Sequence, residues 1–308
     1  MVPALLTGGA RPEPRMPEEL DSRTLDAIVR LAIEEDVGSG DLTTDALVPP
    51  TALARARILA KEEGILAGMD AARTTFEVLD SRLEIEERLE NGAALRPGTS
   101  ILVLRGKARA LLAGERTALN FLGRLSGVAT TASRFVRAVA GTGVTILDTR
   151  KTSPGMRVLE KHAVEVGGAT SHRVGLDAAI LVKRNHVVLA GGDLGDAVSR
   201  AARAAGTGAI VTAEATSLEE ARIAFRAGAA ILLLDNFAPE ALPPVVAALR
   251  EEARTLGRSL ALEASGGVTI ENVRAFAESG VDRVSAGALT RKANWLDVAM
   301  RCEPLAGS

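Results

Sequence analysis

The segment AIVTAEATSLEEARIAFRAGAAILLLDN, residues 209–236, decides the fold class. It contains two apolar runs, Ala209–Ala215 and Ala230–Asn236, on either side of an amphipathic stretch of helical length. Ser217 begins a capping-box pattern, and Gly228 stands where such a helix would end. A strand, a helix and a second strand in this order are typical of a parallel βαβ unit.

The same rhythm extends from residue 129 to residue 290, which we predict to be one catalytic domain. The expected strands are Val144–Asp148, Ala178–Asn185, Ala209–Ala215, Ala230–Asn236, Leu260–Gly267 and Arg283–Leu289. The expected helices are Pro154–Val166, Asp193–Ala205, Ser217–Ala227, Pro239–Thr255 and Ile270–Ser279. Strands and helices that alternate in this way predict an α/β fold, a parallel sheet closed or nearly closed into a (β/α) barrel.

The chain on either side of this stretch lacks the alternation. Residues 21–128 are predicted to form a separate domain with helices and strands in no regular order. Its expected helices are Ser22–Glu35, Asp70–Asp80 and Gly114–Leu125, and its expected strands are Ala54–Leu59, Leu83–Leu89 and Ser100–Gly106. We expect residues 1–20 to be a disordered tail and residues 291–308 to return to the N-terminal domain.

Composition excludes several classes of protein. The formal net charge of −2 argues against a nucleic-acid surface and a polybasic membrane anchor, so neither partner is expected. The single cysteine, Cys302, excludes an intramolecular disulfide and a cysteine-cluster metal site. No apolar run approaches the roughly 20 residues of a membrane span, and we expect a cytoplasmic protein.

Polar residues follow the ends of the expected barrel strands, where barrel enzymes carry their chemistry. One group of these residues is cationic: Arg150, Lys151, His172, Arg173 and Lys183. Like charges repel one another without a ligand, and arginine binds carboxylate and phosphate in bidentate fashion, so the group predicts a polyanionic ligand. The alternative is an internal network of ion pairs with acids such as Asp148, Glu160 and Glu165.

Two further groups of polar residues lie at the ends of the expected strands. The last two strands end in Ser265-Gly266-Gly267 and Ser285-Ala286-Gly287, whose backbone N–H groups suit the usual barrel phosphate site. Glu214 and Asp235 end consecutive strands, and carboxylates beside phosphates indicate Mg²⁺ bridging or hydrogen bonds to ribose. Alternatively, one of the two carboxylates is a structural partner of Lys183.

Three of these stretches resemble quinolinate phosphoribosyltransferases. They are DTRKTSPGMR at 148–157, SHRVGL at 171–176 and LVKRNH at 181–186. Supporting matches include GDLTT at 40–44, GERT at 114–117 and EASGG at 263–267, and the likeness runs from about Leu25 to Leu289. The resemblance implies an N-terminal α/β sandwich domain, a C-terminal seven-stranded open (β/α) barrel and a homodimer-based enzyme.

The implied reaction joins quinolinate to phosphoribosyl pyrophosphate, with Mg²⁺ as cofactor, and yields nicotinate mononucleotide, CO₂ and pyrophosphate. The resemblance implies that quinolinate is bound by Arg150, His172, Arg173 and Lys183, with Arg116 from the neighbouring subunit. The phosphoribosyl residues are expected to be Lys151, Glu214, Asp235, Ser265, Gly266, Gly267, Ser285 and Gly287. Among them we expect Lys151, Glu214 and Asp235 to be catalytic, with Mg²⁺ near the two carboxylates.

Four residues depart from the common pattern of these enzymes: Ser171, Ala178, Arg184 and Thr212. The lost acids and the added arginine make the barrel mouth more basic. Two other activities therefore stay open, a transport-linked paralogue and a phosphoribosyltransferase for another acidic heterocycle. A binding protein without turnover is a third, which the presence of all three polar groups disfavours.

Overall fold

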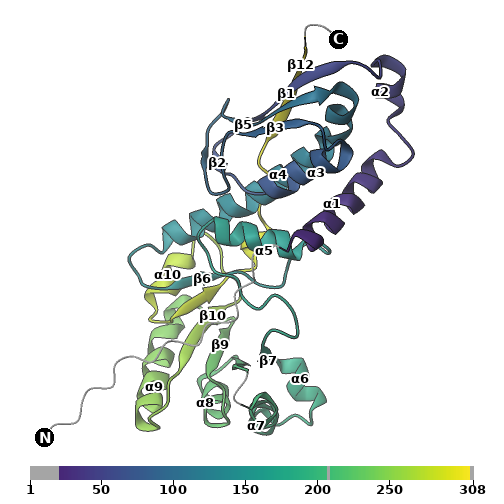
Figure 1. The fold of residues 1–308 in the computed structure, drawn as a ribbon. Coiled ribbons are helices and arrows are strands. Elements are labelled where there is room, and N and C mark those ends of the chain that lie inside the picture. The colour runs from purple at the N-terminus through teal and green to yellow at the C-terminus, as the bar shows by residue number, and fades with distance from the viewer. Residues whose placement is uncertain (1–20, 207–208, 306–308) are drawn as a thin grey trace, which may run out of the picture.

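The computed structural model describes residues 21–206 and 209–305, which form two lobes joined by the long helix α4 (Ala108–Ala138) (Figure 1). The expected tail, residues 1–20, lies outside the described residues. In the part of the chain that is described, no helix combines the length and the apolar character needed to cross a membrane.

The N-terminal lobe is an α/β sandwich. Its antiparallel sheet has the order β12 (Val298–Pro304), β1 (Leu53–Ala60), β5 (Ser100–Lys107) and β3 (Glu84–Glu87). Alternate residues of β1 are buried, and this apolar face packs with α3 (Met69–Leu79) and α4 in one core. The remaining elements are α1 (Ser22–Val37), α2 (Leu42–Leu47), β2 (Gly64–Ile65) and β4 (Ala94–Leu95).

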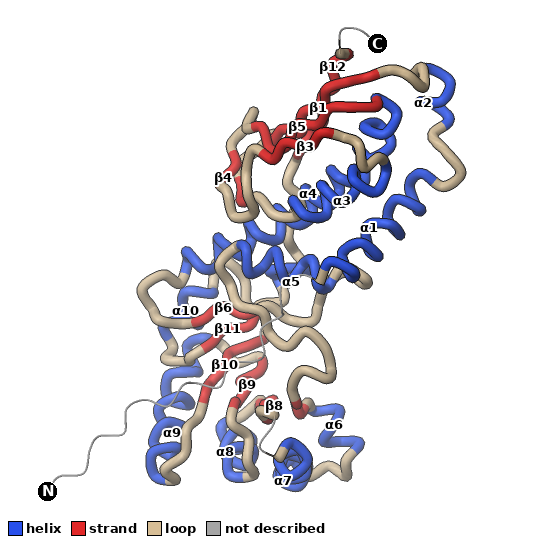
Figure 2. Tube along the Cα trace, viewed as in Figure 1, coloured by secondary structure: helices blue, strands red, loops and turns tan. Residues whose placement is uncertain are grey.

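The C-terminal lobe contains a six-stranded parallel sheet with helices on its outer side (Figure 2). The strand order is β6 (Thr145–Leu147), β11 (Arg283–Ser285), β10 (Ala261–Ser265), β9 (Ile231–Asp235), β8 (Val211–Ala215) and β7 (Ile180–Val182). The helices are α5 (Arg157–Val166), α6 (Arg184–Leu189), α7 (Leu194–Ala205), α8 (Leu218–Arg226), α9 (Leu242–Thr255), α10 (Val273–Glu278) and α11 (Ala288–Arg291). The predicted α/β fold with an open barrel is confirmed.

The seventh strand of the expected barrel is reduced to a single parallel bridge between Leu147 and Thr170. Immediately after this bridge, the backbone N–H of His172 donates to the buried carboxylate of Asp148 at 2.7 Å. Strands β6 and β7 are the two edges of the sheet among the described residues, so the barrel stays open between them.

The helix predicted at Gly114–Leu125 is too short, since α4 runs from Ala108 to Ala138. Gly123 lies inside the predicted helix, and Gly127 lies just beyond its predicted end. In the structure they give room to the returning chain, because a Cβ at Gly127 would overlap the Asn294 carbonyl oxygen. These glycines therefore serve close packing inside the helix rather than its end.

Two expected strands are too long at their C-terminal ends. The strand predicted at Ala178–Asn185 ends at Val182, because the Lys183 backbone N–H donates to His186 Nδ1 and helix α6 begins. The strand predicted at Arg283–Leu289 ends at Ser285 and is followed by α11. In both places the predicted strand runs past the loop into a short helix.

Candidate active site

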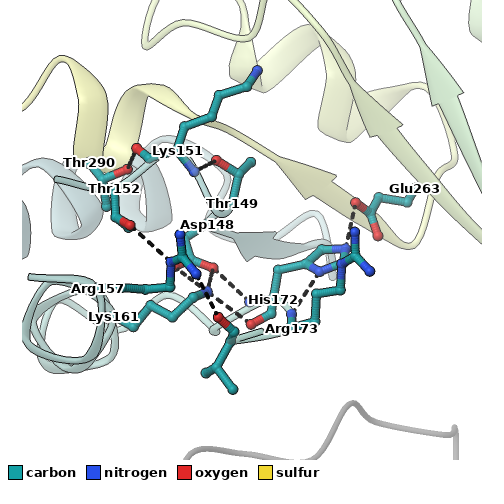
Figure 3. A network of polar contacts seen from close by, with 11 residues as sticks. Asp148, Thr149, Lys151, Thr152, Arg157, Lys161, His172, Arg173, Glu263 and Thr290 are labelled. Carbon is teal, nitrogen blue, oxygen red and sulfur yellow. Dashed lines mark hydrogen bonds and ion pairs between the residues drawn. The ribbon is translucent and has the colours of Figure 1, made fainter. Parts of the chain in front are cut away.

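A buried ion pair organises the end of β6 (Figure 3). Lys161 of α5 donates to both carboxylate oxygens of Asp148, at 2.6 and 2.7 Å, and to the His172 carbonyl oxygen at 2.9 Å. Burial raises the pKa of Asp148, and the Lys161 ammonium acts in the opposite direction. The pair holds the chain at His172 against the end of β6, and Arg150 lies in the loop that follows this strand.

The loop that follows β6 is fixed by a second buried carboxylate, Glu160. It accepts hydrogen bonds from the Ser153 hydroxyl at 2.7 Å and from Arg124 of α4 at 2.7 and 2.9 Å. Arg124 also donates to the Thr290 carbonyl oxygen at 2.7 Å. Asp148 and Glu160 thus form their ion pairs with Lys161 and Arg124, and not with Arg150, Lys151 or Arg173, among the described residues.

Lys151 lies on this loop with its side chain exposed. Its carbonyl oxygen accepts from the Thr290 hydroxyl at 2.8 Å, and its side chain extends away from the Asp148 pair (Figure 3). A Cβ at Gly287 would lie 3.0 Å from Lys151 Cδ. The absence of a side chain at Gly287 therefore leaves room for the Lys151 side chain beside the turn that follows β11. The structure thus brings together Lys151 and Gly287.

Arg150 and Arg173 lie near each other without a carboxylate partner within 4 Å among the described residues. Arg173 is 6% exposed and donates to the Ala179 carbonyl oxygen at 3.0 Å, while the buried Nε of Arg150 has no hydrogen-bond partner. Burial, and then the charge of Arg150, lower the pKa of Arg173. A bound anion would act in the opposite direction, because it favours the charged form of Arg173.

Lys183 and Glu214 form an ion pair of 2.6 Å across the ends of β7 and β8. The alternative of a carboxylate partner for Lys183 is therefore correct for Glu214. Asp235, at the end of β9, lies close enough to feel both groups: burial and the charge of Glu214 raise its pKa, while Lys183 and Lys151 lower it. The structure thus brings two carboxylates and two lysines within electrostatic reach of one another at the strand ends.

The turn after β10 depends on its glycines. Asn236 has a φ of 59°, and its backbone N–H donates to the Ser265 carbonyl oxygen at 2.8 Å. A Cβ at Gly266 would overlap the Asn236 amide side chain, whereas Gly267 faces open space. Two adjacent left-handed glycines, at φ of 91° and 63°, therefore keep the backbone accessible beside Asp235.

Ser285 differs from the glycines of this turn, because it is buried, with only 3% of its surface exposed. Its side chain hydrogen bonds to Glu263, which lowers the pKa of that carboxyl group, so the hydroxyl does not line the mouth with Gly287. Glu263 itself is 1% exposed on β10 and lies 3.5 Å from His172 Nε2. We did not single out Glu263, although a charged residue inside an apolar strand is a visible signal.

Arg116 is exposed on α4, in the N-terminal part of the chain. In the described chain no hydrogen bond or ion pair joins it to Arg150, His172, Arg173 or Lys183. Lys161 and Arg124 are two further functional neighbours missed in the sequence, because their roles depend on burial against partners far along the chain.

Comparison with known proteins identifies the family. Residues 41–126 match the N-terminal domain, and residues 128–301 the C-terminal domain, of quinolinate phosphoribosyl transferase. The human nicotinate-nucleotide pyrophosphorylase [carboxylating] is 41% identical over 280 residues, covering 90% of this chain and 91% of the relative. A probable enzyme of the same name from Bacillus subtilis is 39% identical over 266 residues, covering 86% of this chain and 89% of its own.

Solved structures give the same result. The nicotinate-nucleotide pyrophosphorylase from Francisella tularensis superimposes with a TM-score of 0.85 at 32% identity, covering 94% of this chain and 100% of that one. A Streptococcus pyogenes relative gives a TM-score of 0.86 at 34% identity, covering 94% and 99%. With both domain models matched and identity near 40% over most of its length, this chain belongs to the quinolinate phosphoribosyltransferase family.

Proposed function

We propose that this protein transfers the phosphoribosyl group of phosphoribosyl pyrophosphate to quinolinate, with release of CO₂ and pyrophosphate, and thereby makes nicotinate mononucleotide for NAD biosynthesis. The relatives' name, carboxylating pyrophosphorylase, describes the same reaction written in the reverse direction, starting from the nucleotide. The observation that carries the proposal is the pair Arg150 and Arg173, cationic and without a carboxylate partner in the described chain. A cytoplasmic location remains our expectation.

Quinolinate suits this cationic surface because it bears two adjacent carboxylates on a pyridine ring. The guanidinium groups of Arg150 and Arg173 offer bidentate donors, each charge-assisted hydrogen bond contributing about 1.5–3 kcal/mol. Lys183 and His172 complete the receptor, with Lys183 restrained by Glu214 at 2.6 Å. On this proposal the ligand supplies the negative charge that the arginines lack.

The chemistry requires no nucleophilic side chain. The ring nitrogen of quinolinate attacks C1 of the ribose while pyrophosphate leaves, through a transition state that resembles an oxocarbenium ion. Glu214 and Asp235 are placed to stabilise the developing positive charge electrostatically. The quaternised ring nitrogen then accepts the electron pair of the breaking C–C bond as the 2-carboxylate leaves as CO₂, and a proton replaces it on the ring carbon.

Lys151 and the glycine turns are expected to hold the phosphates. The Lys151 ammonium extends beside Gly287, and Gly266 and Gly267 present backbone that carries no side chain. This arrangement fits the barrel phosphate position after the last two strands. Of the two serines expected to bind phosphate, Ser265 lies at the turn after β10, whereas the Ser285 side chain faces Glu263.

The residues present fit Mg²⁺ as a cofactor shared with the substrate. Among the described residues, no three histidine, cysteine or acidic side chains are grouped as a closed metal cage requires. Mg²⁺ commonly uses only one or two carboxylates together with substrate phosphates and water, and Glu214 and Asp235 form such a pair. When bound, the ion would neutralise charge on the leaving pyrophosphate.

We further propose a homodimer in which Arg116 of one subunit completes the quinolinate site of the other. Two features support this. Arg116 is exposed and not joined to the cationic group of its own chain in the described residues. A groove of about 1010 Å³ between α1, α4 and the Lys151 loop carries the exposed apolar side chains of Leu31 and Trp295, 68% and 55% accessible, which a second subunit would cover.

The decisive experiment incubates the purified protein with quinolinate, phosphoribosyl pyrophosphate and Mg²⁺ and measures nicotinate mononucleotide and CO₂. We expect both products in equal amounts, and little turnover when nicotinate replaces quinolinate, since the second carboxylate is missing. A matched control is Arg254→Ala, which removes an exposed arginine of α9 and should leave the rate unchanged. Failure to form either product would refute the proposed activity and favour the paralogue or another acidic heterocycle.

A further inference from the structure

Both ring nitrogens of His172 face protein groups. Nδ1 accepts a hydrogen bond from the Arg173 backbone N–H at 2.7 Å, and Nε2 lies 3.5 Å from Glu263 Oε1 (Figure 3). A nitrogen that accepts a hydrogen bond carries no proton, so the Nδ1 contact requires the proton of a neutral imidazole to be on Nε2. The Nε2–H group then points toward a carboxylate.

Glu263 is an unusual residue for its position. It lies in the middle of β10, where it is 1% exposed and flanked by the fully buried Leu262 and Ala264. Burying a carboxylate is costly unless it is paired or hydrogen bonded. Its side chain interacts with His172 and Ser285, and Arg283 stands opposite it in the ladder to β11. Because burial of the Glu263 carboxylate is costly, its position beside His172 indicates a role there.

We infer that Glu263 is a positioning residue, which holds the His172 ring in the Nε2–H tautomer and aims that donor at the mouth of the barrel. The inference rests on the proposed function in one respect, that His172 meets the acidic substrate. The 3.5 Å separation is longer than a full hydrogen bond, so Glu263 orients the Nε2–H without engaging it completely. A substrate carboxylate can therefore share the same proton.

The other charged groups around His172 act on its backbone or from further away. From β6, Asp148 accepts from the His172 backbone N–H, and from α5, Lys161 donates to the His172 carbonyl oxygen. The Arg173 side chain is turned to the Ala179 carbonyl oxygen. Among the groups described, Glu263 is thus the charged side chain directed at Nε2.

The test uses ring-nitrogen NMR of the full-length protein labelled with ¹⁵N. The chain has only three histidines, so a His172→Asn sample identifies the signals of His172 by their loss. We expect the wild-type ring to show a protonated Nε2 and an unprotonated Nδ1 at neutral pH. In Glu263→Gln we expect the ring-nitrogen signals of His172 to change, because an amide replaces the carboxylate that lies 3.5 Å from Nε2.

Kinetics provide the second readout. In Glu263→Gln we expect the KM for quinolinate to rise by about tenfold, with a smaller change for phosphoribosyl pyrophosphate, because only the acidic ring meets His172. Glu252→Gln is the matched control, since it removes a carboxylate from the α8–α9 ion pairs and should leave both the His172 signals and the KM values unchanged.

The outcomes separate this inference from the proposed activity. A wild-type ring protonated on Nδ1 would overturn the inference without any variant, and so would a Glu263→Gln protein whose His172 signals match the wild type. If the NMR changes occur but no nicotinate mononucleotide is formed, the positioning role stands and the proposed activity fails. Should Glu263→Gln not fold, the wild-type ring still tests the inference, because a proton on Nδ1 would overturn it.

Discussion

At the scale of single residues, the site is a balance of paired and unpaired charges. Lys183 is paired with Glu214, and Lys161 with Asp148, whereas no carboxylate lies within 4 Å of Arg150 or Arg173 in the described chain. A pair of unneutralised guanidinium groups destabilises the empty site and is stabilised by an anion. The arginines that have no carboxylate partner are therefore the residues that we expect to bind a dicarboxylate.

Arg173→Lys tests this balance. Lysine keeps the positive charge but loses the rigid fork of donors, and it also loses the hydrogen bond to the Ala179 carbonyl oxygen. We expect the KM for quinolinate to increase by about 10–100-fold, the equivalent of one or two charge-assisted hydrogen bonds. Steady-state kinetics measure it, with Arg254→Lys on α9 as the control. An unchanged KM would show that Arg173 does not contact the substrate.

Asp235 predicts a pH dependence. Its pKa is raised by burial and by the charge of Glu214, so it takes up a proton at higher pH than an ordinary aspartate. If the ionised form is needed for turnover, the rate falls as the pH falls through this raised pKa. Glu214→Gln removes one of the two causes, so the pKa of Asp235 should drop. Carboxyl ¹³C NMR titration measures it directly, and a pKa that does not drop would contradict the described coupling.

At the scale of elements, helix α4 ties the two lobes together. Its 31 residues pass from the α/β sandwich to the barrel, and Arg124 on it reaches Glu160 of α5 and the carbonyl oxygen of Thr290. The chain after Thr290 then crosses the glycine face of α4 and joins the N-terminal sheet as β12 beside β1. The position of the Lys151 loop thus depends on a helix that begins in the other lobe.

Gly127→Ala tests the close contact on α4. Alanine favours helix formation over glycine by about 1 kcal/mol, yet its Cβ would overlap the Asn294 carbonyl oxygen. We expect a net loss of about 1–3 kcal/mol in the free energy of unfolding, measured by urea denaturation. Gly195→Ala in α7 is the control, because the nearest atoms to its Cβ lie at 3.3 and 3.4 Å, and it should be neutral or stabilising. Equal stability of Gly127→Ala and wild type would show that the contact relaxes freely.

At the scale of the whole molecule, the strand ends of the barrel collect every group of the proposed site except Arg116. That residue lies on the N-terminal lobe, exposed on α4. A single chain therefore supplies the phosphate cradle, the carboxylates and most of the cations. The proposed dimer adds one arginine from outside, which makes the assembly part of the active site.

Mixed dimers test this sharing. Arg116→Ala and Lys151→Ala should each be inactive alone, but on our proposal a heterodimer has one site in which both residues are intact. We expect the mixture to recover up to about a quarter of the wild-type activity, by random pairing of one competent site among four. Activity of unfolded and refolded mixtures measures it, with subunit exchange verified by differently tagged chains. Heterodimers that form but remain inactive would refute the shared site.

The sequence by itself determined the α/β class, the barrel and the three polar groups at its strand ends. Each rests on a local signal: apolar runs of strand length, caps such as Ser217, and polar residues that directly follow a buried strand. Because parallel strands bring their C-terminal ends to one edge, the topology alone places Lys183, Glu214 and Asp235 together.

Only the tertiary structure decided which charges are neutralised and where helices end. Lys161 and Arg124 look like surface residues in the sequence, and Glu263 is a charged residue inside an apolar strand. All three acquire roles through partners that lie 36, 13 or 91 positions away: Arg124 with Glu160, Lys161 with Asp148, and Glu263 with His172. Gly127 likewise acquires its role only when the chain at Asn294 is packed against it. The free energy of burying a charged side chain, or of packing a chain segment against glycines on a helix, depends on residues that are distant in the sequence. No local sequence pattern encodes these residues.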